Sequence, residues 1–309
     1  PAETAPEDPA PAAEEAAPED TSPEDTAPDT AADAAPADDS TIGDLAQGVT
    51  TNRLPSVTDP AEPETAAEPA ETATPEDPAE EAEDTRPPLE RHAAEFENPE
   101  GKPLMAIILI DDGRGAIGPQ ALADFPYPIS FAVNAAAPGA ADRAAAYRAA
   151  GSEVLALVDL PETATARDAE VSMEAYLAAV PEAVAVMEGT GTGLQASREA
   201  TEQLAPILTE SGHGLVMFPQ GLNTAQKLIA REGVPSASVF RDFDANGQDA
   251  RAIRRFLDQA AFRAGQEEGG VIMVGRLRAE TISALLLWGL QDRASSVALA
   301  PVSAVLRAN

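Results

Sequence analysis

From Gly101 to the end of the chain, apolar residues gather in short continuous runs separated by longer stretches of mixed polarity. Continuous runs, unlike alternating apolar and polar positions, are typical of strands that are buried on both faces. The runs predict strands at Leu104–Ile110, Ile129–Val133, Glu153–Val158, Gly214–Phe218, Ser238–Phe240, Val271–Gly275 and Val297–Val302.

The stretches between these runs are alanine-rich or amphipathic, which predicts helices. The expected helices cover Ala140–Ala150, Ser197–Thr209, Thr224–Arg231, Asp249–Ala264 and Ala279–Asp292. Strand and helix alternate about seven times, an order that favours a parallel α/β sheet or barrel. We predict an irregular (β/α) barrel with one or two strands missing.

The first hundred residues have a different composition, dominated by Ala, Pro, Glu, Asp and Thr. They hold 29 of the 53 acidic residues, three of the 20 basic residues and 17 of the 28 prolines of a chain whose net charge is −33. Such a segment buries too little apolar surface to offset its chain entropy. We therefore predict a disordered acidic linker over 1–100 and one folded domain, long enough for its own core, over 101–309.

One island of lower charge, Ser40–Thr58, interrupts this linker with several apolar residues. It is either a short motif that orders when it docks on an envelope protein or an incidental part of the spacer. Both interpretations stay open.

Composition also excludes several classes of function. The acidic balance argues against nucleic acid and anionic membrane surfaces as partners. Cysteine is absent, which removes disulfides, zinc–thiolate sites and thiol nucleophiles. No apolar run approaches the ~20 residues of a membrane span. The sequence begins with Pro1 rather than Met, so we expect that a signal peptide or membrane anchor precedes it.

Ligands and catalytic groups of parallel α/β folds lie at the carboxyl ends of the strands. Asp111 and Asp112 follow the first predicted strand and could bind a hard cation or act as acid and base. The alternative is structural, with one carboxylate capping the next turn and the other solvated. The later strand ends supply the candidate binding residues Asn134, Asp159, Gln195, Gln220, Asp242 and Arg276, with Asp244 close to Asp242.

The two histidines do not follow strands. His92 precedes the predicted domain, and His213 falls in a helix-to-strand turn, where we expect a surface position at the opposite end of the barrel. Without cysteine or a usable histidine, thiol catalysis, Ser-His-Asp catalysis and imidazole-ligated metals all lack parts. We therefore expect no metal and no other cofactor, with a divalent cation at Asp111 and Asp112 as the alternative.

Several motifs follow one another in a recognisable order. They are AIILIDDGRG (Ala106–Gly115), FPYPISFAVNAAAP (Phe125–Pro138), GSEVLALVDLP (Gly151–Pro161), REGVPSASVFRD (Arg231–Asp242), GGVIMVGRLRAETISALLLW (Gly269–Trp288) and the closing LAPVSAVL. In this order they resemble the divergent polysaccharide deacetylases of proteobacterial envelopes. The resemblance implies an irregular (β/α) barrel, a glycan or peptidoglycan substrate, a location in the periplasm or cell envelope, and a metal held by Asp and His.

The sequence departs from the family pattern at the histidines. Asp111 and Asp112 match the opening Asp pair of the family, but TGTGLQAS lacks the family's histidine, PQGL lacks its Asp, and Arg276 stands at its last histidine. A fixed guanidinium there is expected to pair with Asp111 or Asp112 in place of the metal. This favours a catalytically silent member that keeps a glycan-binding groove or serves as an envelope scaffold.

Two alternatives stay open. One is an active hydrolase with a hard cation in a carboxylate-only site of Asp111, Asp112, Asp159 and Asp242. The other is a protein-interaction module that works through the acidic arm and the Ser40–Thr58 island.

Overall fold

The computed structural model describes residues 84–113, 117–122 and 125–309. Residues 1–83 of the predicted linker, the Ser40–Thr58 island and Arg114 of the first strand-end turn lie outside the described residues. Residues 84–100, the rest of that linker, are described, and they include a short helix whose Leu89 is buried in the core. Among the described residues, no helix combines the length and the apolar character that crossing a membrane requires.

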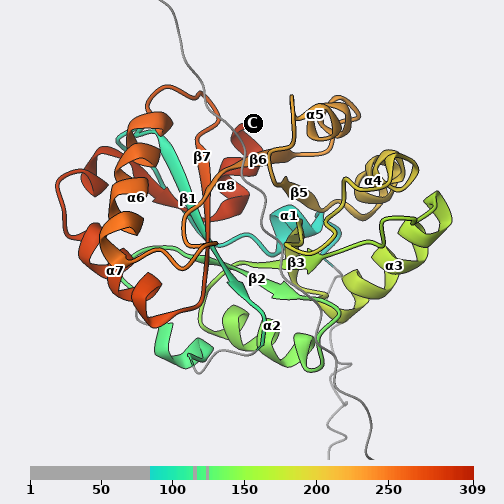
Figure 1. The fold of residues 1–309 in the computed structure, drawn as a ribbon, viewed down its shortest axis with the longest axis horizontal. Helices are drawn as coiled ribbons and strands as arrows, with labels where there is room; N and C mark the ends of the chain where they lie inside the picture. The colour runs from blue at the N-terminus through green and yellow to red at the C-terminus, as the bar shows by residue number, and fades with distance from the viewer. Residues whose placement is uncertain (1–83, 114–116, 123–124) are drawn as a thin grey trace, which may run out of the picture. The chain divides into compact units, whose positions relative to one another are not determined.

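Seven parallel strands and their connecting helices form the irregular barrel that the sequence predicts (Figure 1). The strands pair in the order β2-β3-β4-β5-β6-β7-β1, and β1 also pairs with β2, which closes the barrel. Their bounds are β1 Leu104–Asp111, β2 Ser130–Asn134, β3 Val154–Val158, β4 Ala183–Glu188, β5 Gly214–Met217, β6 Ser236–Asp242 and β7 Val271–Arg276. We call the end with the carboxyl ends of the strands the mouth, and the opposite end the foot.

Helices surround the strands, with α3, α4 and α5 following one another on one side and α6 and α7 packed together on the other (Figure 1). Their bounds are α1 Pro88–Arg91, α2 Ala140–Ala149, α3 Ala166–Ala179, α4 Arg198–Ser211, α5 Thr224–Arg231, α6 Ala250–Ala264, α7 Ala279–Gly289 and α8 Val302–Ala308. Two 3-10 turns, Pro119–Leu122 and Ala294–Ser296, complete the order.

The strands bury both faces because the fold has two cores. Side chains such as Ile108, Ile110 and Val274 fill the barrel interior, together with Leu306 of α8 at the foot. Alternate residues, such as Leu109, point outward into a larger layer between strands and helices. This double burial explains why the strands read as continuous apolar runs.

The closure of the barrel is irregular. Residues 108–111 of β1 pair with β2, whereas residues 104–106, on the same edge, pair with the short strand β8, Ala298–Ala300. β8 therefore fills the lower half of the seam between the first two strands. The expected strand Val297–Val302 is shorter than predicted, because α8 begins at Val302.

The sequence pattern missed α3 and β4. The run from Ala166 to Glu188 is rich in Ala, Val, Met and Glu, all compatible with one helical stretch. In the structure the chain breaks at Val180–Pro181 and continues as the fully buried strand β4.

Candidate functional site

A cavity of about 400 Å³ opens at the mouth, around the carboxyl ends of β4 to β7. Four of the predicted site residues line it, namely Gln195, Gln220, Asp242 and Arg276. The other lining residues are Glu188, the glycine-rich loop 189–193, Phe218, Pro219 and Ala245. The remaining predicted residues, Asp111, Asp112, Asn134 and Asp159, are not among those that line this cavity.

The side chain of Asp111 points away from the barrel interior. Its neighbour Ile110 faces the interior, so the alternation of the strand turns Asp111 outward toward α2. Its Oδ2 accepts a hydrogen bond from the hydroxyl of Tyr147 at 2.9 Å, and its Oδ1 accepts one from the backbone N–H of Gly113 at 2.8 Å. The Nε of Arg143 lies 3.7 Å from the same carboxylate. Asp111 therefore fixes α2 to the end of β1.

Two other predicted residues have clear places. Asp112 follows β1 as an exposed residue. Asn134 caps the turn after β2, where its Oδ1 accepts a hydrogen bond from the backbone N–H of Ala136 at 3.0 Å.

Arg276 enters the mouth, as predicted from its place after β7, but the predicted partner was wrong. Its guanidinium Nη1 donates to Oδ1 of Asp242 and, at 3.1 Å, to Oδ1 of Asp244. Arg276 lies in register with Ile110 of β1, which faces the interior, while Asp111 is turned outward. β6, on the other side of β7, supplies both carboxylates of this cluster through its end and the loop that follows it.

Asp244 is the most buried member of this cluster, with a side chain only 1% exposed. Its Oδ2 accepts hydrogen bonds from the backbone N–H of Arg276 at 2.8 Å and the hydroxyl of Thr281 at 2.6 Å. Burial disfavours the charged guanidinium of Arg276, but the hydrogen bonds to Asp242 and Asp244 outweigh it, so the pKa of Arg276 is raised. The cluster is a partly buried ion pair with charge-assisted hydrogen bonds.

Asp159 and Glu188 shape the loop 189–193. Oδ1 of Asp159 accepts from the backbone N–H groups of Gly191 at 3.0 Å and Gly193 at 2.7 Å. A side chain at Gly189 would overlap the Asp159 carboxylate, and Gly193 has a φ of +71°. Glycine is therefore favoured at both positions.

Glu188 is a site residue that the sequence analysis missed. It ends β4, is 4% exposed and accepts from the backbone N–H of Leu194 at 2.9 Å and of Phe218 at 2.7 Å. It also accepts from the amide of Gln195 at 2.8 Å, which fixes the orientation of Gln195 on the cavity wall. Its position at the end of a strand could have identified it as a site residue, but that strand, β4, was not predicted.

We expect Asp159→Ala to loosen the loop 189–193, because two backbone donors lose a charged acceptor. The loss in the free energy of unfolding should be about 1–3 kcal/mol. Hydrogen exchange of the Gly191 and Gly193 amides should speed up, while Asp159→Asn, which keeps Oδ1, should change it less. Unchanged exchange in the alanine variant would show that the loop does not depend on this carboxylate.

Both histidines lie at the foot. His213 is in the predicted turn before β5, but the expected surface position was wrong, because it is only 7% exposed. Pro87 and Pro88 press against the preceding Gly212, and α1 covers this part of the foot. Burial, followed by the positive charges of His92 and Arg91, lowers the pKa of His213 to about 4.

The residues at the mouth do not fit a metal held by Asp and His. Within the described parts of the chain, no group of three His, Asp or Glu side chains could hold a metal ion. At the mouth, the Arg276 guanidinium already pairs with the carboxylates of Asp242 and Asp244. A cation next to this guanidinium would be repelled.

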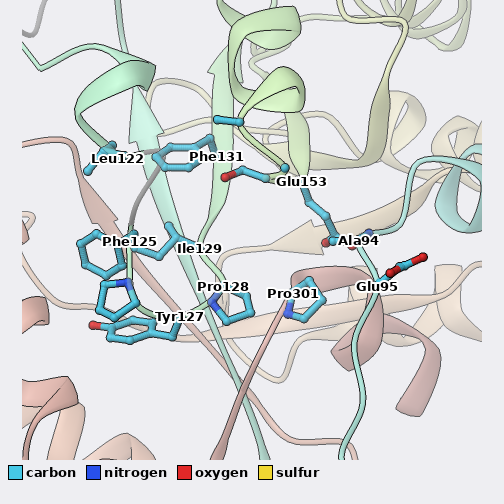
Figure 2. Close-up of a pocket in the computed structure, with 14 residues that line it drawn as sticks. Ala94, Glu95, Leu122, Phe125, Tyr127, Pro128, Ile129, Phe131, Glu153 and Pro301 are labelled. Atoms are coloured by element: carbon cyan, nitrogen blue, oxygen red, sulfur yellow. The ribbon is translucent and has the colours of Figure 1, made fainter.

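Aromatic side chains gather at the foot more than at the mouth. A cavity of about 270 Å³ lies there, with Phe125 and Tyr127 on one side and Ala94 and Glu95 on the other (Figure 2). The rings of Phe125 and Tyr127 meet edge to face, with centroids 4.9 Å apart. At the mouth, Phe218 is the single aromatic residue among those that line the cavity.

The carboxylate of Glu153 is buried beside this cavity at the foot. It accepts from the backbone N–H groups of Ala94 and Ser303, both at 2.9 Å, and from the hydroxyl of Ser303 at 2.5 Å. Glu153 therefore ties the segment after α1 and the start of α8 to β3.

The comparisons with known proteins agree with this fold. The sequence profile described as divergent polysaccharide deacetylase matches residues 108–306. No curated protein matches the chain.

Solved structures provide further matches. An uncharacterised protein from Agrobacterium tumefaciens C58 is 20% identical, with a TM-score of 0.60, over 71% of this chain and 95% of the other. A protein from Enterococcus faecalis V583 is 10% identical, with a TM-score of 0.51, over 65% of this chain and 97% of the other. The catalytic domain of a peptidoglycan N-acetylglucosamine deacetylase from Eubacterium rectale is 15% identical, over 67% and 91%, with a TM-score of 0.40. At these identities the structural matches concern the fold alone.

Proposed function

We propose, from the premise that the chain belongs to the divergent polysaccharide deacetylase family, that its mouth binds a glycan strand of the bacterial envelope without hydrolysing it. The observation that carries this proposal is the ion-pair cluster of Arg276 with Asp242 and Asp244. Deacetylation by metal-activated water needs a bound cation and groups that move protons. The guanidinium of Arg276 is fixed on the carboxylates at the mouth, where it repels a cation and so opposes metal binding.

The positions of the histidines support the same proposal. His213 and His92 lie at the foot, so neither can ligate a metal or transfer a proton at the mouth cavity. The imidazole that a deacetylase would use to protonate a leaving amine is therefore missing from the cavity wall.

The alternative of an active, carboxylate-only site has less support. It requires Asp111, Asp112, Asp159 and Asp242 to converge on one cation. Asp111 instead faces Tyr147, Asp159 accepts from the loop amides, and Asp242 pairs with Arg276.

The cavity offers groups suited to a neutral sugar. The amide of Gln220 can both donate and accept hydrogen bonds, as sugar hydroxyls do. The Nε2 of Gln195 already donates to Glu188 and to the carbonyl of Phe218, which leaves the amide oxygen of Gln195 to accept from a sugar hydroxyl. Phe218 adds an apolar surface. The peptidoglycan partner and the periplasmic location belong to this proposal.

We expect the purified full chain to release no acetate from acetylated chitooligosaccharides or peptidoglycan fragments, with or without added divalent metal. Acetate release can be measured by an enzyme-coupled assay, with an active deacetylase as the positive control. Metal-dependent release that disappears in Asp112→Ala would overturn the proposal of a silent enzyme.

Binding is tested separately, by co-sedimentation of the full chain with purified peptidoglycan. Gln195→Ala and Gln220→Ala should each reduce the bound fraction several-fold, because they remove amides from the cavity wall. Gln259→Ala, on the exposed face of α6, is the matched control and should bind like the parent. Sedimentation that none of these variants changes would refute a binding site at the mouth and favour the interaction-module alternative.

A further inference from the structure

Four arginines on β6 and α6 have no carboxylate partner among the described residues. They are Arg241, near the end of β6, and Arg251, Arg254 and Arg255 in the first half of α6. None of them makes an ion pair or a side-chain hydrogen bond with a described residue. Residues 101–309 carry 24 acidic and 17 basic residues, so acidic partners are not scarce. These four side chains therefore leave positive charge unneutralised on two neighbouring elements, β6 and α6.

A β-bulge directs Arg241 to the outside of the barrel. The register of β6 against β7 shifts between Val239 and Arg241. Asp242 then faces Arg276 at the mouth, whereas Arg241 contacts Phe256 of α6 on the outer wall. The consecutive residues Arg241 and Asp242 therefore point to opposite sides of the strand.

Phe256 holds two guanidinium groups near each other. The guanidinium carbon of Arg241 lies 4.6 Å from the ring centroid and that of Arg255 lies 5.5 Å from it, so the two carbons are within about 10 Å of each other. Arg251 precedes Arg255 by four residues and lies on the same exposed face of α6. An anion bound next to these side chains would be attracted by both guanidinium groups.

Arg241 is the most constrained of the three. Its Nε is buried and has no hydrogen-bond partner in the described parts of the chain. Buried donors without partners are uncommon in native proteins, and a bound ion is one of the ways in which such a group is satisfied. Its cation–π contact with Phe256 holds the side chain in place, so little conformational entropy remains to be lost on binding.

We propose that Arg241, Arg251 and Arg255 form a binding site for a phosphate group on the outer wall of the barrel. A phosphate has enough oxygens to accept from two or three guanidinium groups at once, whereas one fork already satisfies both oxygens of a carboxylate. The net charge of −33 opposes long polyanions, so the site suits a single phosphoryl group. This site is separate from the mouth cavity and does not depend on the proposed glycan function.

The test is calorimetric titration of the full chain with inorganic phosphate at low ionic strength. Arg241→Gln and Arg255→Gln should each weaken binding at least tenfold. Arg263→Gln is the matched control, because Arg263 lies on the same helix but pairs with Glu267. It should stay within twofold of the parent. Equal affinity in the parent and Arg241→Gln, or an equal loss in Arg263→Gln, would overturn the site.

Two further experiments identify the class of ligand. Acetate should bind at least tenfold more weakly than phosphate, and equal affinity would overturn the assignment to phosphate. Sedimentation with phosphatidylglycerol vesicles separates the sources, because vesicle binding that is lost in Arg255→Gln identifies a lipid headgroup. Phosphate binding without vesicle binding identifies a soluble phosphoryl compound. Circular dichroism melting confirms that each variant is folded, and the exposed Arg255 keeps the test valid if Arg241→Gln unfolds.

Discussion

Replacing Arg276 with alanine should lower the free energy of unfolding by about 3–5 kcal/mol, the range for a broken, partly buried ion pair. The reason is the environment of the two carboxylates that remain. Asp244 has a side chain 1% exposed and Asp242 one 18% exposed, so neither recovers full hydration when the guanidinium is removed. Urea denaturation of the parent and the variant measures the difference.

Two variants separate the charge from the geometry. Arg276→Lys keeps a positive charge but places it on a more compact and more strongly hydrated group, so some stability should be lost, though less than in the alanine variant. Adding Asp242→Asn to Arg276→Ala should recover part of the stability, because it removes one uncompensated charge. A loss within about 1 kcal/mol for Arg276→Ala would show that the pair behaves as a solvated surface pair.

Acidification should destabilise the domain between pH 6.5 and about 4 through His213. The pKa of this histidine falls from 6.5 to about 4 on folding, since burial disfavours its charged form. The unfolded chain therefore binds a proton in this window that the folded domain does not, and stability falls as the pH falls. The full difference corresponds to about 3 kcal/mol.

The effect can be isolated by comparing His213→Gln with the parent across this window. The variant should lose most of the His213 contribution, so that its stability depends less steeply on pH. Comparison with the parent is essential, because Glu153 acts in the opposite direction. Burial raises the pKa of Glu153 against the hydrogen bonds from Ser303, so its contribution is lost as the pH rises. Identical pH dependence in His213→Gln and the parent would contradict the assignment to His213.

The sequence pattern was sufficient for the barrel because both cores leave a direct trace in it. Strands buried on two faces appear as apolar runs, and polar residues at their ends mark the mouth. Gln220, Asp242 and Arg276 could be found in this way, whereas Gln195 was found in the glycine-rich loop 189–193 and the residues that follow it. The pattern failed for β4, whose alanines and valines continue the composition of the preceding helix, and Glu188 was missed with it.

The sequence pattern could not predict in which direction a side chain at the end of a strand points. Whether Asp111 faces the mouth or the helices depends on the register of β1, and a shift of one residue would reverse it. The bulge in β6, which brings Asp242 to Arg276, leaves no signal in the sequence either. The burial of His213 could not be predicted either, because the segment that contacts the neighbouring Gly212, Pro87–Leu89, lies more than a hundred residues earlier in the chain.

The seam between β1 and β2 is completed by the last elements of the chain, which determines the order in which the barrel can close. Nearly all of the barrel precedes β8, which covers the lower edge of β1, and Ser303, which binds the buried Glu153. A chain that is made or exported from its N-terminus therefore has to wait for both. A domain that ends before Ala298 therefore carries an open strand edge, and its Glu153 carboxylate keeps the hydrogen bond from Ala94 but lacks those from Ser303. Open edges pair with other chains, so the interval before the last elements emerge is when this domain most needs a chaperone.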